Sequence, residues 1–182
     1  MQIMKNFIVL LGLSVMVGMA ITLTGCEPKT PIGKVFFVTP KNGTTVRQTF
    51  AIVGGFESLK LTPAGTVNEK GGHLHLLIDT DLPPLDKPIP PGPAIDRTGH
   101  ADMQGGQQFL HIASGASDIR VTLDPGEHTL QLLLGDHNHV PHDPPVFSEK
   151  ITITVKPERE EVITKIPKGS GGERPDVSRG LE

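Results

Sequence analysis

Residues 118–135, DIRVTLDPGEHTLQLLLG, contain two strand patterns joined by a turn. From Ile119 to Leu123, apolar residues alternate with polar ones, which is the two-residue period of a strand with one buried face. A Pro-Gly pair then turns the chain, and the run that ends at Gly135 is strongly apolar. We therefore expect one strand on each side of this turn, both contributing to a hydrophobic core.

Turn residues divide the rest of the chain into similar short segments. Asn42-Gly43, for example, readily supplies the positive φ angles of a tight turn. No long window combines the apolar periodicity and the capping residues of a helix. About seven strands are expected, at residues 34–39, 45–54, 57–62, 73–79, 118–124, 128–135 and 148–155. The pattern predicts an all-β domain, a single antiparallel β-sandwich of the immunoglobulin type, with a small barrel as the alternative.

Composition divides the chain into four segments. Residues 1–25 resemble a secretory leader, with one positive charge at Lys5 and an apolar run before a small-residue cleavage pattern. Residues 26–33 form a Pro-containing spacer, and residues 34–156 hold the strand patterns of one β-sandwich domain. Residues 157–182 have mixed charge and few apolar side chains, so we expect a disordered tail.

Cys26 is the only cysteine and follows Leu-Thr-Gly, which resembles a bacterial lipobox. The sequence therefore predicts a lipoprotein whose Cys26 carries acyl chains such as palmitate and anchors the domain in a membrane. Glu27 resembles the sorting residue of outer-membrane lipoproteins, which predicts a periplasm-facing position in the bacterial cell envelope. The transmembrane alternative is weaker, because the apolar run is at the short limit for crossing a bilayer. A lone thiol excludes intramolecular disulfides and thiolate metal sites.

Charge and motifs narrow the functional classes. The formal net charge is −3 and the chain has no Trp or Tyr, which disfavours nucleic-acid binding. No Gly-x-Ser-x-Gly elbow, His-Glu-x-x-His helix or phosphate loop is present, so we expect a protein that is not an enzyme. A metal ion with an open coordination position would be the remaining route to catalysis. A scaffolding lipoprotein in contact with another envelope protein is a further alternative.

All eight histidines lie between His73 and His142, and this crowding is the main indication of function. Imidazole is the commonest side-chain metal ligand. Strand parity places His73 and His75 together on the face opposite the apolar one, outside the core, and places His128 at the core rim. We therefore predict a Cu(II) or Zn(II) site in which further imidazoles complete the coordination. The candidate ligands are His73, His75, His128, His139 and His137, with Asp79 and Asp136 as outer-shell acceptors.

A structural network is the competing interpretation. A histidine at a strand start can donate a ring hydrogen to a loop carbonyl and hold a turn with no ion present. The loop after Gly135 could likewise be held by a hydrogen-bond network of its Asp and His residues. Taken singly, His100, His111 and His142 are expected to be exposed rather than to act as ligands. The Pro-rich stretch 81–98 is expected to be a stiff, extended excursion.

Three ordered motifs resemble a family of bacterial exported proteins, the domain of unknown function 4399. They are Gly72-His-Leu-His-Leu-Leu-Ile-Asp79 with the later Gly106-Gln107, the Pro125-Gly126 turn with its strand, and the run from Leu134 to Pro145 that leads into the last strand. The resemblance covers roughly residues 34–156 and implies export and a compact β domain, with no established activity. His100 fits the first histidine that family members carry before the Gly-Gln pair, whereas Asp102 stands in place of the second.

Overall fold

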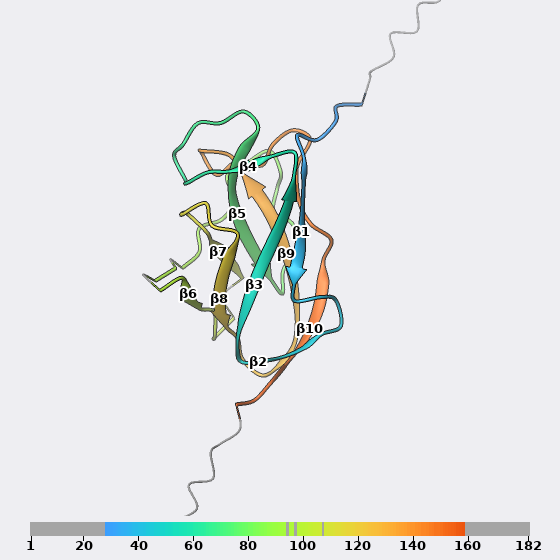
Figure 1. Ribbon diagram of the computed structural model, residues 1–182, viewed down its shortest axis with the longest axis vertical. Coiled ribbons are helices and arrows are strands. Elements are labelled where there is room, and N and C mark those ends of the chain that lie inside the picture. The colour runs from blue at the N-terminus through green and yellow to red at the C-terminus, as the bar shows by residue number, and fades with distance from the viewer. Residues whose placement is uncertain (1–27, 94, 97, 107, 159–182) are drawn as a thin grey trace, which may run out of the picture.

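The computed structural model describes residues 28–93, 95–96, 98–106 and 108–158 as two packed β-sheets (Figure 1). Within these residues the chain forms ten strands and no helix. The predicted leader 1–25, Cys26 and the tail from residue 159 onward lie outside the described residues. The all-β sandwich that the alternation predicts is confirmed.

The two sheets differ in size. The smaller has four strands in the order β1-β3-β8-β6. These are β1 (Lys34–Thr39), β3 (Thr49–Glu57), β8 (Asp118–Thr122) and β6 (His100–Asp102). The larger has six strands in the order β2-β10-β9-β5-β4, and β7 also pairs with β5. These are β2 (Thr45–Arg47), β10 (Ile151–Lys156), β9 (Gly126–Gly135), β5 (Gly71–Ile78), β4 (Lys60–Leu61) and β7 (Phe109–His111).

The main core lies between the two sheets. Ile119 and Val121 of β8 belong to the same buried apolar cluster as Leu132 and Leu134 of β9. The alternate residues of β10 join this cluster too, while its Thr152 and Thr154 are less buried or exposed. The period-two pattern of the sequence therefore identifies the core-facing side of these strands, because successive side chains point to opposite faces of a sheet.

Strand number and direction differ from the prediction of seven antiparallel strands. The expected strand 45–54 is two strands, because the chain changes sheet at Gln48: β2 pairs with β10, whereas β3 pairs with β8. The expected strand 57–62 shrinks to β4, because Ser58 takes a left-handed φ of 58°. β6 and β7 have three residues each, too few to show an alternating pattern. The pairs β2–β10, β4–β5 and β6–β8 are parallel, while the long central pairs are antiparallel.

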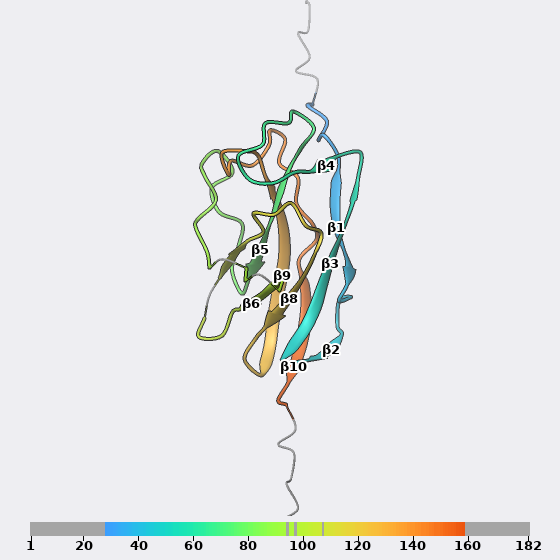
Figure 2. The ribbon, with the colours of Figure 1, turned by 60° about the vertical axis from the view of Figure 1, so that its left-hand side comes forward.

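The larger sheet is covered on its second face as well. All eight residues of β5 are buried, including His73 at 0% and His75 at 1% exposure. The cover is the loop between β5 and β6 (Figure 2), which we call the covering loop. Its Ile89 packs with Leu77 of β5 in a second apolar cluster. The predicted position of the two histidines outside the core is therefore wrong. Parity gives the correct face of β5, but this loop removes that face from water.

Among the described residues, none belongs to a helix with the length and apolar character needed to cross a bilayer.

Candidate metal centre

Four histidines gather where β5, β7 and the turn after β9 meet. His73 and His75 are two residues apart on β5, so both side chains lie on the same face of the strand. His111 on β7 pairs directly with His75 in the antiparallel register. His139 lies in the turn after β9, and its backbone carbonyl accepts a hydrogen bond from the Ile89 N–H of the covering loop. We call these four residues the histidine cluster.

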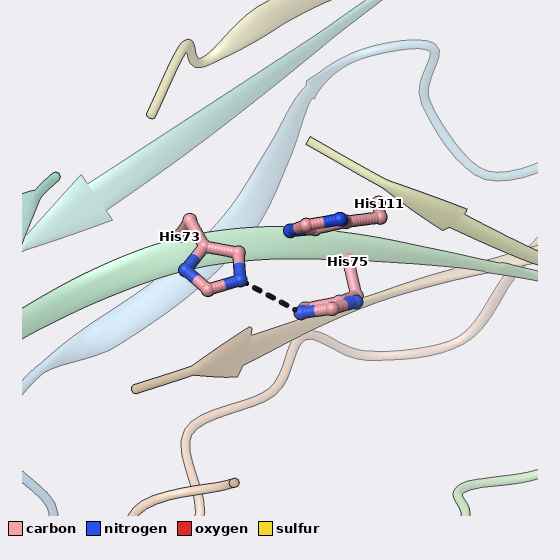
Figure 3. A group of neighbouring side chains, drawn as sticks. All are labelled: His73, His75 and His111. Atoms are coloured by element: carbon pink, nitrogen blue, oxygen red, sulfur yellow. Dashed lines mark hydrogen bonds between the residues drawn. The ribbon is translucent and has the colours of Figure 1, made fainter. Parts of the chain in front are cut away.

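The four rings are in direct contact. The Nε2 atoms of His73 and His75 are 3.1 Å apart, and His111 lies beside this pair (Figure 3). The Nε2 atoms of His111 and His139 are also 3.1 Å apart. One ligand nitrogen from each of His73, His75 and His111 lies within 4.8 Å of the other two. The six distances between ring centres range from 4.5 to 5.7 Å, so each ring neighbours the other three.

The turn that carries His139 is closed by Asp136. One carboxylate oxygen of Asp136 accepts the backbone N–H groups of Asn138 and Val140, each at 2.8 Å. His139 adopts a left-handed φ of 66°, a conformation that costs free energy in a residue other than glycine and that surrounding bonds must maintain. Asp136, predicted as an outer-shell acceptor, therefore supports His139 by fixing the backbone that bears it.

Burial lowers the pKa values of His73, His75 and His111 and so favours their neutral forms. Desolvation, together with His111 and His139, lowers the pKa of His73 from 6.5 to about 4, against a smaller opposing effect of Asp136. Desolvation and the three neighbouring rings lower the pKa of His75 to about 2. Desolvation and His139 also lower the pKa of His111. Neutral imidazole offers a nitrogen lone pair, which is the form that binds a metal.

The hydrogen bonds within the cluster do not satisfy every ring nitrogen. In the bond between His73 and His75, one Nε2 donates and the other accepts, because a neutral ring carries a single N–H. The accepting ring must then hold its proton on Nδ1. Both Nδ1 atoms are buried without a hydrogen-bond partner. The pair therefore contains one buried N–H with no acceptor, which costs about 1–3 kcal/mol.

The spacing of the rings matches the requirements of a shared ion. Two imidazole nitrogens bound to one ion at about 2.0–2.1 Å are about 3.3 Å apart in tetrahedral coordination. The two Nε2 pairs of the cluster, at 3.1 Å, are close to this separation. The widest nitrogen separation within the His73, His75 and His111 group, 4.8 Å or less, requires the rings to move inward by about 1.5 Å at most. These three histidines could therefore hold a metal ion. His139 lies outside this group of three, but its Nε2 is 3.1 Å from that of His111.

His128 and Asp79, both predicted for the site, lie together but apart from the cluster. His128 Nδ1 is 2.6 Å from Asp79 Oδ2, and His128 Nε2 is 2.9 Å from the Asp124 carbonyl oxygen. Asp79 Oδ1 also accepts the Thr129 N–H at 2.7 Å. Both ring nitrogens of His128 therefore face protein oxygens that accept hydrogen bonds, and neither is directed at the cluster.

The remaining histidines also bind protein groups. His137, a predicted ligand, bonds through Nε2 to the Asn138 side chain. His100 bonds to the Thr122 hydroxyl at 2.7 Å, and His142 donates to the Gly71 carbonyl at 3.0 Å. Neither is fully exposed, contrary to expectation. Of the five predicted ligands, the structure thus brings together His73, His75 and His139. His128 and His137 lie elsewhere.

His111 is the residue that sequence reasoning missed. It was expected to be exposed, but it is only partly so and lies among the other three rings. The available signal was weak: Phe109 and His111 flank the buried Leu110 with strand parity over three residues. Such a short run does not distinguish a strand from a loop. Only the pairing of β7 with β5 puts His111 beside His75.

Comparisons with known proteins give a family and little more. The sequence model of a domain of unknown function, DUF4399, matches residues 52–156. This is the family that the three sequence motifs resemble, and the match spans β5, β7 and the turn after β9. No curated protein and no solved structure matches the chain.

Proposed function

Because this chain belongs to the DUF4399 family, whose description names no activity, we propose its function from the histidine cluster. The protein binds one copper or zinc ion, Cu(II) or Zn(II) being the ordinary divalent forms, through His73, His75 and His111. His139 supplies a fourth ligand. Imidazole sets suit both metals, and Cu(II) binds more tightly than Zn(II) at equal geometry.

The observation that carries this proposal is the convergence of four imidazole rings at a place where two of them are buried. Three of their nitrogens lie within 4.8 Å of one another, and two rings are almost completely buried. Burying polar groups without adequate partners is unfavourable, and here two Nδ1 atoms have none. An ion bound through the Nε2 atoms would leave both Nδ1 atoms without partners, but its binding free energy becomes part of the folding free energy of the loaded protein and would offset that cost.

We further propose that the protein works in the bacterial cell envelope. The support is sequence-based: the Leu-Thr-Gly-Cys26 pattern is that of a lipidated cysteine, and Glu27 fits outer-membrane sorting. The described domain begins a few residues after Cys26, so an acylated Cys26 would hold the metal site close to the membrane surface. The site then serves as a periplasm-facing metal binder, with an envelope protein as a partner that delivers or receives the ion.

A second candidate function has its own observation. The His111–His139 hydrogen bond joins β7 to the turn after β9, and these two rings pack against the hydrogen-bonded His73 and His75 of β5, all without any ion. On this alternative the cluster is a structural network in a non-catalytic interaction lipoprotein. An ion bound through the Nε2 atoms would leave the same Nδ1 atoms without partners, so the convergence of the ligand nitrogens, rather than the Nδ1 atoms, favours the metal.

Equilibrium dialysis with metal analysis distinguishes these functions. The full chain, in detergent, should bind one equivalent of copper or zinc at micromolar free metal. The double variant His73→Ala, His75→Ala should lose this binding, and His100→Ala, which removes a histidine outside the cluster, should keep it. Circular dichroism of each variant reports whether the sheets are retained. No binding above background by the folded wild-type protein overturns the metal proposal and leaves the structural network.

A further inference from the structure

We propose that the histidine cluster is selective for monovalent copper, and that it binds Cu(I) more tightly than Cu(II) or Zn(II). This inference rests on the proposed function and concerns which ion that same site prefers. It is carried by the charge of the ligand set, the burial of its rings, the absence of hydrogen bonds behind them and the arrangement of the rings in space.

The proposed ligands carry no negative charge. The group of potential ligands at this place, within the part of the chain that the structure describes, consists of histidines, with no carboxylate or thiolate. Four neutral imidazoles leave the full charge of the ion uncompensated. The cost of transferring an ion from water into a medium of low dielectric constant increases with the square of its charge, so a divalent ion pays about four times the cost of a monovalent one of similar size.

Burial makes this cost relevant. His73 and His75 are 0% and 1% exposed, and they lie under the covering loop beside apolar residues such as Ile89. His111 and His139 are only partly exposed. The nearest acidic influence on the cluster is Asp136, which acts on His73 through space. One oxygen of that carboxylate is already engaged with the backbone of its own turn, so Asp136 does not serve as a ligand.

The Nδ1 atoms of His73 and His75, on the far side of each ring from the ion, also affect which ion is preferred. A metal-bound histidine usually donates its other N–H to a carboxylate or carbonyl, which makes the ring a stronger donor and stabilises higher charge on the metal. The Nδ1 atoms of His73 and His75 have no such partner. With their Nε2 atoms facing each other across 3.1 Å, these two rings would bind an ion as ordinary, unassisted imidazoles. The lack of this assistance weakens the binding of Cu(I) less than the binding of Cu(II).

The arrangement of the four rings in space also distinguishes between the ions. In tetrahedral coordination, the centres of imidazole rings bound at about 2.0–2.1 Å lie about 5.2 Å from one another. A square-planar set would instead give four short and two much longer separations, the latter about 6.4 Å. The six observed separations, 4.5 to 5.7 Å, lie nearer to the tetrahedral set than to the square-planar one, and the stacked rings of His75 and His111, now 11° from parallel, would rotate to bind one ion. Square-planar or tetragonal coordination is what Cu(II) prefers. The tetrahedral arrangement therefore disfavours Cu(II). Zn(II) accepts tetrahedral sites, but the cost of burying its double charge disfavours it.

The test measures affinities for the three ions on the same protein. The full chain in detergent is titrated with Cu(I) anaerobically against a Cu(I)-specific chelator, and separately with Cu(II) and Zn(II) against chelators of known affinity. We expect Cu(I) to bind at least about tenfold more tightly than Cu(II), which for a one-electron couple corresponds to a midpoint potential about 59 mV above that of aqueous copper. The copper-loaded protein should be reduced by ascorbate without losing its ion.

Controls separate the preference from the binding itself. His111→Ala removes a partly exposed ligand, keeps His73 and His75 on β5, and should weaken Cu(I) binding. His100→Ala, outside the cluster, should leave Cu(I) binding unchanged. Cu(II) or Zn(II) binding more tightly than Cu(I) to the wild-type protein would overturn this inference while leaving the proposed function intact. Failure to bind any of the three ions would overturn the proposed function, and this inference with it.

Discussion

The histidine cluster and the His128–Asp79 pair use the same side chain in opposite ways. His128 has an acceptor at each ring nitrogen, Asp79 on one side and the Asp124 carbonyl on the other. In the cluster, His73 and His75 have other imidazoles as neighbours and no acceptor at Nδ1. The difference teaches that the partners of a histidine, together with its burial, decide its chemistry. The nitrogens of His128 are taken up by protein oxygens, which gives the ring a structural role, whereas the buried rings of the cluster face one another and keep lone pairs for an ion.

The largest expected effect is on the pH dependence of stability. The folded-state pKa values of His73 and His75, about 4 and about 2, lie below the unfolded value of 6.5. The unfolded chain therefore binds protons first as the pH falls. The metal-free protein keeps this contribution to its stability above about pH 6.5 and loses it as the pH falls from 6.5 toward the folded-state pKa values of about 4 and about 2, by on the order of several kcal/mol in total.

Urea unfolding across this pH range measures the effect. In the variant His73→Leu, His75→Leu the decrease should be much smaller, because both buried titrating rings are gone, while His100→Ala should retain the wild-type slope. Equal slopes in wild type and the Leu variant would show that the two rings titrate normally and would contradict the burial argument.

The next effect is stabilisation by metal. At free metal 100-fold above the dissociation constant, the folded state gains about 2.7 kcal/mol. Thermal unfolding of the wild-type protein and of His128→Ala should show the same increment, since His128 lies outside the cluster. The variant His75→Ala should show little or none. A lost increment in His128→Ala, with the fold intact, would mean that the two regions are not independent.

A smaller effect concerns the structural pair alone. Replacing His128 by Ala removes the charge-assisted bond to Asp79 and leaves the Asp124 carbonyl without this donor, which should destabilise the metal-free protein by about 1–3 kcal/mol. Denaturant unfolding at neutral pH measures it. A change of less than a few tenths of a kcal/mol would mean that the pair is solvated in solution and does not hold the strand.

The smallest effect is steric. Gly135 pairs with His73 across β5 and β9, and a Cβ there would lie 3.0 Å from His75 Nε2. Gly135→Ala should therefore displace the His75 ring and weaken metal binding by about tenfold, comparable to the loss of an outer-shell partner. Competition titration measures the affinity. Unchanged affinity would indicate that the ring has room to move without losing its ion.

The fold could be predicted from the sequence because its main strands carry a local signal. Alternation from Ile119 to Leu123 and in β10 identifies residues that prove to be buried, and parity puts His73 and His75 together on one face of β5. The cover over that face could not be predicted. It depends on Ile89 in the covering loop, whose N–H bonds to the His139 carbonyl fifty residues later in the chain, a contact with no periodic signature.

The site was predicted only in part for the same reason. Position on a strand is a local property, but the pairing of β7 with β5 that brings His111 to His75 is not. His128 has the correct parity for the core rim and is 14% exposed, yet its acceptors turn it away from metal binding. Sequence spacing thus identifies histidines that share a strand, and only tertiary pairing decides which of the others join them.

The most direct test of the cluster is to remove one histidine of each kind, in separate variants, and to compare their metal binding. Equilibrium dialysis of the full chain with copper and zinc is carried out for His111→Ala, which removes a ring in contact with His73, His75 and His139, and for His128→Ala, which removes the ring bound to Asp79. We expect His111→Ala to lose or strongly weaken binding and His128→Ala to bind like wild type. Retained binding in folded His111→Ala together with loss in folded His128→Ala would contradict the account.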